Sequence, residues 1–252
     1  MYNDLDYLNS PLEIQKELKS FFISNSVKVV FDIGACDGLD SVKYGRIFPN
    51  SKVYSFEPLE NNVSLIKTNI VKYNSKNIFP FQIALSEQKG VAEFFVSSGR
   101  PENITEDVNW DFGNKSSSLL EPNKTLEVHP WLKFQEKVEV ITDTLENFSN
   151  ENKISIIDFI HMDVQGAELM VLKGAGKYIS KIKMIWLEVE NVELYKNQPL
   201  ASDVESFLII NGFTKIKDTV SNIAGDQLWV NYKYFFKKKI TRNLYLLFKK
   251  LN

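Results

Sequence analysis

The chain has 252 residues, a formal net charge of −2, 44% apolar residues and 25% charged residues. This composition is typical of a globular protein with a sizeable core, and the near-zero net charge excludes a global electrostatic attraction to nucleic acid. A single cysteine excludes an internal disulfide, and an acidic N-terminus without an apolar run is unlike a signal peptide, so we expect a cytoplasmic protein.

The first third of the chain alternates helices and strands. Ser10, Pro11 and Glu13 form the pattern of a capping box, which predicts a helix from Ser10 to about Phe22 within an N-terminal helical extension, residues 1–26. Apolar runs predict strands at 27–33, 53–56 and 78–85, and helical spacing predicts helices at 39–48 and 61–73. Such alternation with short connections indicates a parallel sheet with helices on both faces.

A polar insertion interrupts this alternation. Residues 90–96 are predicted to form an added strand that pairs with its neighbour as a hairpin, whereas residues 97–136 are rich in Asn, Ser and Pro and only weakly periodic. A segment of this length without regular elements is typically a functional lid or a disordered stretch. Two tryptophans, Trp110 and Trp131, favour an ordered lid.

Regular order returns after the insertion. Apolar runs predict strands at 138–141, 156–162, 182–189, 213–216 and 228–236, and helices are predicted at 167–172 and 202–210. We therefore expect one doubly wound α/β domain over residues 27–236, with the lid insertion at 97–136.

A loop at residues 32–38, Asp-Ile-Gly-Ala-Cys-Asp-Gly, follows the first strand. It lacks the Gly-x-Gly-x-x-Gly spacing of a dinucleotide site, because Cys36 and Leu39 stand at the second and third glycine positions. Asp32 would repel a pyrophosphate and suits a ligand with a cationic amine. Glu57, at the end of the second strand, is placed to accept hydrogen bonds from both hydroxyls of a ribose. Together these residues indicate a site for S-adenosylmethionine.

Five segments, at 31–38, 54–58, 83–86, 160–168 and 171–175, resemble the FkbM family of methyltransferases. The stretch Asp-Val-Gln-Gly-Ala-Glu at 163–168 is the most specific of them, and the resemblance runs from about residue 27 to residue 213. It implies a Rossmann-like class I methyltransferase fold, with a seven-stranded, mostly parallel sheet that contains one antiparallel strand. It also implies O-methylation, often of sugars or other secondary metabolites.

The resemblance further implies which residues contact the cofactor. The methionyl end would be lined by Asp32, Gly34, Ala35, Asp37 and Gly38 of the first loop, and the ribose would be held by Glu57 and Pro58 after the second strand. Ala84 and Leu85, at the end of the third strand, would flank the adenine, and Asp163, at the end of the fourth strand, would face the transferred methyl group. The chain departs from the family at His161, where lysine is usual, and at Cys36, where asparagine is common.

Asp163 and His161 are the candidate catalytic residues. They lie two positions apart on one predicted strand and share a face, so the base for an acceptor hydroxyl is either Asp163 itself or His161 oriented by Asp163. A structural imidazole satisfied by the backbone is the alternative for His161. His129, in the insertion, is a second candidate base. No metal ligand is predicted, and a Mg²⁺ site at Asp163 with Glu190 and Asn191 is an alternative that the pattern does not favour.

Residues 237–252 combine basic side chains with an apolar stripe, which predicts a short amphipathic helix. This tail would either contact an anionic membrane, at the inner face and near a lipid-linked glycan, or pack on its own domain or on a second subunit of a homodimer. The predicted acceptor is a hydroxyl group of a sugar, a glycan precursor or a secondary metabolite. The alternatives are a methyltransferase acting on protein or lipid, and a non-catalytic scaffold that binds the cofactor.

Overall fold

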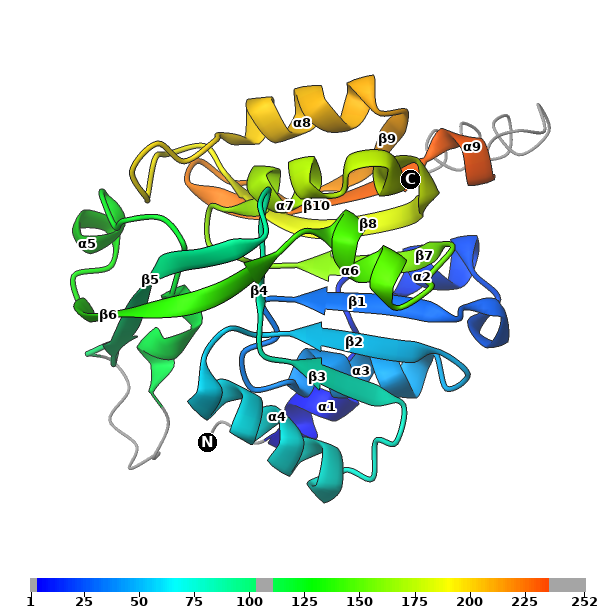
Figure 1. Ribbon diagram of the computed structural model, residues 1–252, viewed down its shortest axis with the longest axis horizontal. Coiled ribbons are helices and arrows are strands. Elements are labelled where there is room, and N and C mark those ends of the chain that lie inside the picture. The colour runs from blue at the N-terminus through cyan, green and yellow to red at the C-terminus, as the bar shows by residue number, and fades with distance from the viewer. Residues whose placement is uncertain (1–3, 103–110, 236–252) are drawn as a thin grey trace.

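The computed structural model describes residues 4–102 and 111–235, so Trp110 and the predicted tail at 237–252 lie outside the described residues. A central sheet has seven strands in the order β3-β2-β1-β7-β8-β10-β9 (Figure 1). Their bounds are β1 (Val29–Ile33), β2 (Lys52–Phe56), β3 (Ile78–Phe81), β7 (Ile157–Met162), β8 (Ile182–Glu190), β9 (Phe213–Asp218) and β10 (Ala224–Asn231). The five strands from β3 to β8 run parallel, and β10 is antiparallel to both of its neighbours. This arrangement confirms the predicted seven-stranded, mostly parallel sheet.

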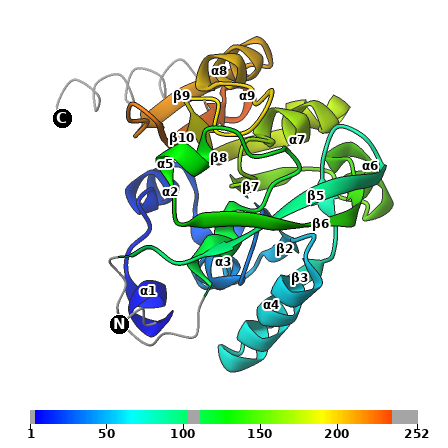
Figure 2. The same cartoon turned by 90° about the vertical axis from the view of Figure 1, so that its left-hand side faces the viewer.

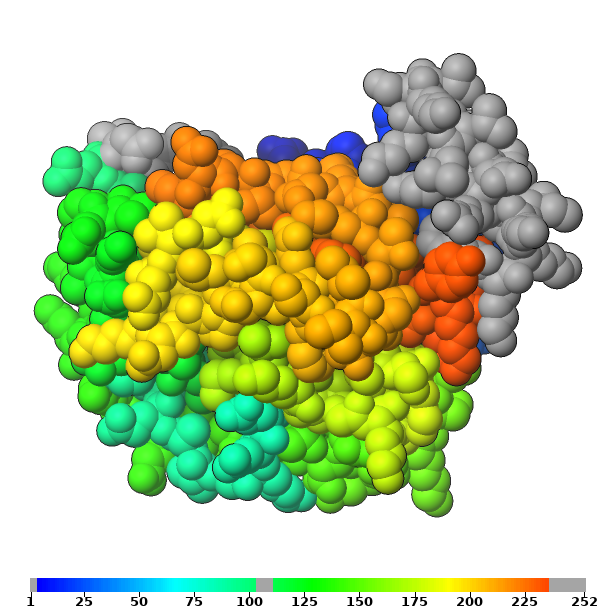
Figure 3. Space-filling model, turned by 90° about the horizontal axis from the view of Figure 1, so that it is seen from above, coloured from blue at the N-terminus to red at the C-terminus, as the bar shows by residue number. Residues whose placement is uncertain are grey.

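Helices cover both faces of the central sheet, as expected when its strands are apolar on both sides. One face packs against α6 (Leu145–Glu151), α7 (Glu168–Gly174) and α8 (Ala201–Ile210), in a core that includes Phe31, Phe148 and Trp229. The other face packs against α1 (Asp4–Asn9), α2 (Gln15–Phe21) and α3 (Leu39–Ile47), in a core that includes Tyr44 and Phe159. The helix α4 (Glu60–Lys72) lies beside α3 and β3 (Figure 1). Seen from above, α8 and the segment that leads into it cover one side of the molecule (Figure 3).

A second, three-stranded sheet crosses one end of the molecule (Figure 2). It contains β4 (Ala84–Leu85), β5 (Gly90–Gly99) and β6 (Leu132–Asp143), in the order β4-β6-β5. The prediction of one strand over 78–85 was therefore wrong. β3 is an edge strand of the central sheet, so the chain leaves it after Phe81 and pairs with β6 from Ala84 onward. The hairpin prediction was also wrong about the partner, because β5 pairs with β6 across the whole insertion.

The described part of the insertion is ordered around this small sheet. It holds the short 3-10 helix η2 (Phe112–Ser116) and the helix α5 (Thr125–Val128), and its last residues, 132–136, belong to β6. Phe95 and Ser118 form an isolated antiparallel bridge, and Pro122 and Tyr195 form another. These bridges hold the insertion against β5 on one side and against the chain after β8 on the other.

Some element ends differ from the prediction, and one helix was not predicted. Ser10 does not cap a helix that follows it: its hydroxyl donates to the Tyr7 carbonyl at the end of α1, and α2 begins only after Ile14. The last strand ends at Asn231 instead of continuing to residue 236, and α9 (Tyr232–Phe235) follows, because Phe235 packs on the rings of Phe21 and Phe22. Helix α6 was not predicted; it starts at Thr144, whose hydroxyl accepts from the Asn147 amide.

Two further 3-10 helices, η1 (Ser24–Ser26) and η3 (Gly176–Lys181), complete the elements. Within residues 4–102 and 111–235, no helix is long and apolar enough to cross a membrane.

Candidate active site

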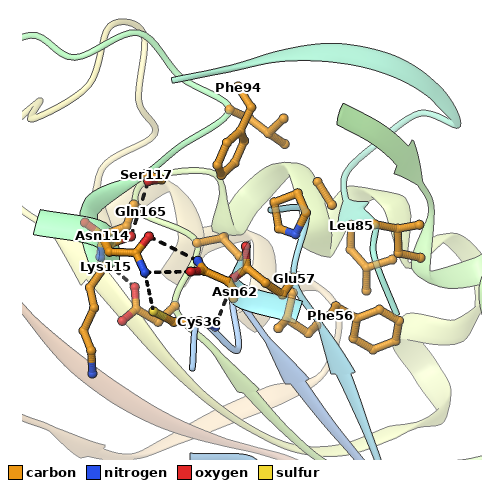
Figure 4. A pocket seen from close by; sticks show the side chains of 18 residues that line it. Cys36, Phe56, Glu57, Asn62, Leu85, Phe94, Asn114, Lys115, Ser117 and Gln165 are labelled. Carbon is orange, nitrogen blue, oxygen red and sulfur yellow. Dashed lines mark hydrogen bonds between the residues drawn. The ribbon is translucent and has the colours of Figure 1, made fainter. Parts of the chain in front are cut away.

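A cavity that is partly open to solvent lies at the carboxyl ends of β1, β2 and β7 (Figure 4). This is the edge at which open α/β sheets bind their ligands. The strand ends contribute Gly34, Glu57, Pro58 and Asp163, and the small sheet and insertion close the cavity. The residues that line the cavity from the small sheet, from the turn before it and from the insertion are Ile83, Ala84, Leu85, Phe94, Asn114, Lys115, Ser117 and Leu119.

Gly34 brings the first loop into direct contact with the end of β7. Its φ is +85°, and a Cβ at this position would lie 1.8 Å from the carbonyl oxygen of Asp163. The amides of Gly34 and Ala35 both donate to the Phe56 carbonyl at 3.0 Å, which ties the same loop to the end of β2. Only glycine is compatible with this close approach and this backbone conformation.

The carboxylate of Glu57 forms part of the cavity wall and supports the first loop. The residue is 5% exposed; its Oε2 accepts from the Cys36 amide at 3.0 Å and its Oε1 accepts from the Leu59 amide at 2.9 Å. Burial raises the pKa of Glu57 to about 7, against the opposing effect of these hydrogen bonds. Each oxygen retains a lone pair, so the carboxylate has the capacity to accept hydrogen bonds from two hydroxyl groups of a ligand.

One side of the cavity is apolar. The rings of Phe56 and Phe94 and the side chains of Ile83, Leu85 and Leu119 provide this surface, and Figure 4 shows Phe94 and Leu85 on the side of the cavity away from Lys115. Such a wall suits a flat, weakly polar group such as a purine base.

The polar side of the cavity is built by residues that the sequence did not single out. Asn62, from α4, and Asn114, from η2, exchange side-chain hydrogen bonds of 3.2 and 2.7 Å. The Asn114 amide also lies 3.8 Å from the Cys36 sulfur. Burial raises the pKa of the Cys36 thiol well above its ordinary value, with Asp37 and Glu57 adding to the effect, so the sulfur is a neutral part of the wall.

Gln165 connects two carboxylates at the ends of β7 and β8. Its Nε2 donates to Asp163 Oδ1 at 2.7 Å and to Glu188 Oε2 at 2.9 Å. Its Oε1 lies 3.1 Å from the Tyr195 hydroxyl, and its carbonyl accepts from the Ser118 hydroxyl at 2.7 Å. Gln165 has a φ of +54°, a conformation that non-glycine residues adopt mainly where surrounding contacts enforce it. The sequence contains Gln165 within the most specific motif but carries no signal for these contacts.

His161 does not lie against Asp163 as expected. Its Nδ1 is 2.8 Å from Asp32 Oδ1, and the second oxygen of Asp32 accepts from the Ser41 hydroxyl. Burial alone would lower the pKa of the imidazole, but the hydrogen bond and charge of Asp32, with the charges of Asp40 and Asp163, raise it to about 9. His161 is therefore a cation at neutral pH and has no lone pair with which to act as a base.

The remaining predicted cofactor residues support the cavity wall. Asp32 is fully buried, and Ala35 and Asp37 are 5% and 6% exposed. Asp37 accepts from the Leu39 amide at 3.0 Å at the start of α3, and its pKa is raised by burial. Gly38 precedes α3 with a φ of +77°, and a Cβ at this position would lie 3.0 Å from the Ile66 side chain. Of the ten predicted residues, Gly34, Glu57, Pro58, Ala84, Leu85 and Asp163 line the cavity.

The other candidates do not line the cavity. His129 is half-buried beside Trp131, with 6.1 Å between ring centroids. Glu190 is 2% exposed, and burial together with the charges of Glu168 and Asp163 raises its pKa to about 9. Asn191 donates to the Ser221 carbonyl at 2.9 Å. Among the residues that the structure describes, no three His, Cys, Asp or Glu side chains are grouped so as to hold a metal ion.

Comparison with known proteins identifies relatives over most of the chain. The family model for the methyltransferase FkbM domain matches residues 32–215. The 2-O-methyltransferase NoeI of Sinorhizobium fredii (strain NBRC 101917 / NGR234) is 27% identical over 225 residues, which cover 89% of this chain and 87% of that protein. Methyltransferase sdnD of Sordaria araneosa is 24% identical over 230 residues, covering 84% and 86% of the two chains.

A solved structure supports the same fold. The crystal structure of methyltransferase FkbM from Methylobacillus flagellatus KT superposes with a TM-score of 0.54 at 14% identity. The match covers 89% of this chain and 49% of the other, so this chain spans about half the length of that protein.

Proposed function

Since the chain belongs to the FkbM family of S-adenosylmethionine-dependent methyltransferases, we propose that it methylates a hydroxyl group of a sugar or glycan precursor. The observation that carries the proposal is that one cavity holds Gly34, Glu57 and Asp163, three residues from the ends of three parallel strands. A relative named a 2-O-methyltransferase supports an oxygen acceptor, and the family resemblance supports a sugar.

The residues of the cavity fit the cofactor. Gly34 allows the backbone approach that any side chain would block, Glu57 offers a buried carboxylate to a pair of ribose hydroxyls, and Ala84 and Leu85 border the apolar wall that suits adenine. When bound, S-adenosylmethionine supplies a methyl group activated by a positively charged sulfur. The remaining cofactor residues, Asp32, Ala35, Asp37 and Gly38, would act by holding the loop.

Asp163 is the proposed base for the acceptor hydroxyl. Its Oδ1 is oriented by Gln165, whereas its Oδ2 makes no hydrogen bond to any of the described residues. That oxygen would take the proton as the O–H bond of the acceptor breaks, which leaves the acceptor oxygen as the nucleophile. His161, held as a cation by Asp32, does not compete for this role.

Cofactor binding is tested first, by calorimetry with S-adenosylhomocysteine. We expect the wild type to bind, Glu57→Gln to lose roughly tenfold or more in affinity because two ribose hydrogen bonds weaken, and the exposed control Glu60→Gln to bind like the wild type. No binding by the wild type, or equal binding by Glu57→Gln, would contradict the site.

The acceptor is tested by comparing the masses of surface glycans from cells with and without the gene. A glycan one methyl group lighter in the knockout, restored by the wild type and not by Asp163→Asn, is expected. Unchanged glycans would count against a sugar acceptor, and restoration by Asp163→Asn would count against Asp163 as the base.

A further inference from the structure

His161 and Asp32 pair at the point where two strands enter the site. They are direct partners in the parallel register of β1 and β7, one position before Ile33 and Met162 (Figure 1). The ladder continues beyond them, because the Asp163 amide donates to the Ile33 carbonyl at 3.0 Å. The next contact along is that of Gly34 with the Asp163 carbonyl, which forms the cavity wall. The Asp32–His161 pair therefore lies on the two strands just before the contact between the 32–38 loop and Asp163.

The Asp32 carboxylate is closed off from the cavity and from solvent. It is 0% exposed, and its two oxygens are occupied by His161 Nδ1 from β7 and by the Ser41 hydroxyl from α3. Ser41 in turn lies 2.6 Å from the Ser55 hydroxyl on β2. One carboxylate thus joins β1, β7 and α3, with β2 reached through Ser41. Removing the cationic partner of a buried carboxylate leaves its charge uncompensated, which is strongly destabilising for the local structure.

The surroundings of His161 favour its charged form. The carboxylates that interact with its charge come from several elements: Asp32 from β1, Asp40 from α3, Asp163 after β7 and Asp226 from β10. The ring of Tyr44, from α3, lies 5.3 Å away between centroids and adds no charge at neutral pH. The imidazole side chain is 15% exposed, so it is largely withdrawn from water.

We infer that His161 is a positioning residue for the cofactor: as a cation it holds the Asp32 carboxylate, and through Asp32 and Ser41 it keeps the 32–38 loop against Asp163 in its binding conformation. This inference rests on the proposed function, because it assumes that the cofactor binds at this loop. His161 then acts as a fixed charge next to the loop and not as a general base. This role also explains how Asp32 serves the site without lining the cavity.

The charge state of His161 is measurable without any acceptor, because the chain has only two histidines, His129 and His161. Nuclear magnetic resonance titration of the two imidazoles, assigned with the variant His129→Gln, should show His161 losing its proton near pH 9. In Asp32→Asn the His161 titration should move to lower pH. A His161 that titrates at or below the ordinary value of about 6.5 in the folded wild type would overturn the inference.

The effect on the cofactor site is measured by calorimetry with S-adenosylhomocysteine. We expect His161→Gln to weaken binding by about tenfold or more, His161→Lys to restore most of the affinity because it keeps a cation beside Asp32, and His129→Gln to have no effect. Equal affinity of a folded His161→Gln and the wild type would overturn the inference. A wild type that does not bind at all would instead contradict the proposed function.

If His161→Gln does not fold, the pH dependence of ligand binding by the wild type and by His161→Lys tests the inference instead. The affinity of the wild type should fall relative to that of His161→Lys as the pH passes about 9, since lysine stays charged there and the amine of the ligand titrates equally with both proteins. Parallel pH profiles for the wild type and His161→Lys would overturn the inference.

Discussion

The side-chain amides of Asn62 and Asn114 each donate a hydrogen bond to the oxygen of the other, at 3.2 and 2.7 Å (Figure 4). Asn62 belongs to α4, beside the β2 end that carries Glu57, whereas Asn114 belongs to η2 in the insertion. This pair fastens the insertion to the half of the sheet that carries Glu57, at the edge of the cavity. It gives the predicted lid a specific attachment point.

Breaking this attachment should speed the release of the cofactor product. Each neutral hydrogen bond contributes about 0.5–1.5 kcal/mol, so we expect Asn114→Ala to raise the dissociation rate of S-adenosylhomocysteine by roughly tenfold, measured by stopped-flow displacement. Asn123→Ala is the matched control, because Asn123 lies in the same insertion and its exposed side-chain amide donates a long hydrogen bond of 3.4 Å to the Glu193 carbonyl. Equal rates for the two variants would show that the Asn62–Asn114 pair does not retain the ligand.

Gly34→Ala should abolish cofactor binding and destabilise the fold. Its Cβ would lie 1.8 Å from the Asp163 carbonyl oxygen, whereas a Cβ at Gly212, which has a nearly identical φ of +84°, meets nothing within 4 Å. Both alanines would bear the roughly 1–2 kcal/mol cost of the left-handed conformation, so Gly212→Ala isolates that cost.

We expect urea unfolding to show Gly34→Ala to be less stable than Gly212→Ala by about 2 kcal/mol or more, because the backbone of the site loop must shift. Two variants of equal stability, both binding S-adenosylhomocysteine, would show that the loop accommodates a side chain.

Glu57 should make the stability of the ligand-free protein depend on pH. Its pKa is about 7 when folded and 4.5 at its ordinary value, so folding favours the protonated form. The stabilisation is fully present below about pH 4.5 and is lost as the pH rises through 7. The shift corresponds to about 3 kcal/mol.

The difference in free energy of unfolding between the wild type and Glu57→Gln isolates this contribution, because other buried carboxylates such as Glu168 and Glu190 titrate in both proteins. Urea titrations between pH 4.5 and 8 should show the wild type losing stability relative to the variant as the pH rises. A difference that stays constant over this range would refute the raised pKa.

Cys36 should react slowly with thiol reagents. It is the one cysteine of the chain, it lines the cavity, and burial raises its pKa, so little reactive thiolate exists near pH 8. The rate with a chromogenic disulfide should increase greatly on unfolding in urea. It should fall further when S-adenosylhomocysteine binds to the folded protein. Reaction of the folded protein at the unfolded rate, with no protection by the ligand, would place Cys36 outside a closed cavity.

Part of the site was predictable because it depends on position along a strand. Gly34, Glu57 and Asp163 each follow a predicted strand, and the carboxyl ends of parallel strands necessarily meet at one edge of a sheet. The helix start at Ser10 was wrong although its local pattern was complete, because the chain there already ends α1. A capping pattern shows that a side chain is able to form a hydrogen bond with a nearby backbone group, but it does not show which helix that group belongs to.

The sequence by itself determined the family, the alternation of strands and helices, and the strand ends at which the proposed cofactor residues lie, since these follow from hydrophobic periodicity and short motifs. Only the tertiary structure decided which side chains act together. Asn62 and Asn114 are 52 positions apart, and Asp32 and His161 are 129 apart. A hydrogen bond requires two atoms within about 3 Å and suitably directed, and no local pattern carries that information across such separations. The fold therefore changed His161 from a candidate base into a charge that holds Asp32.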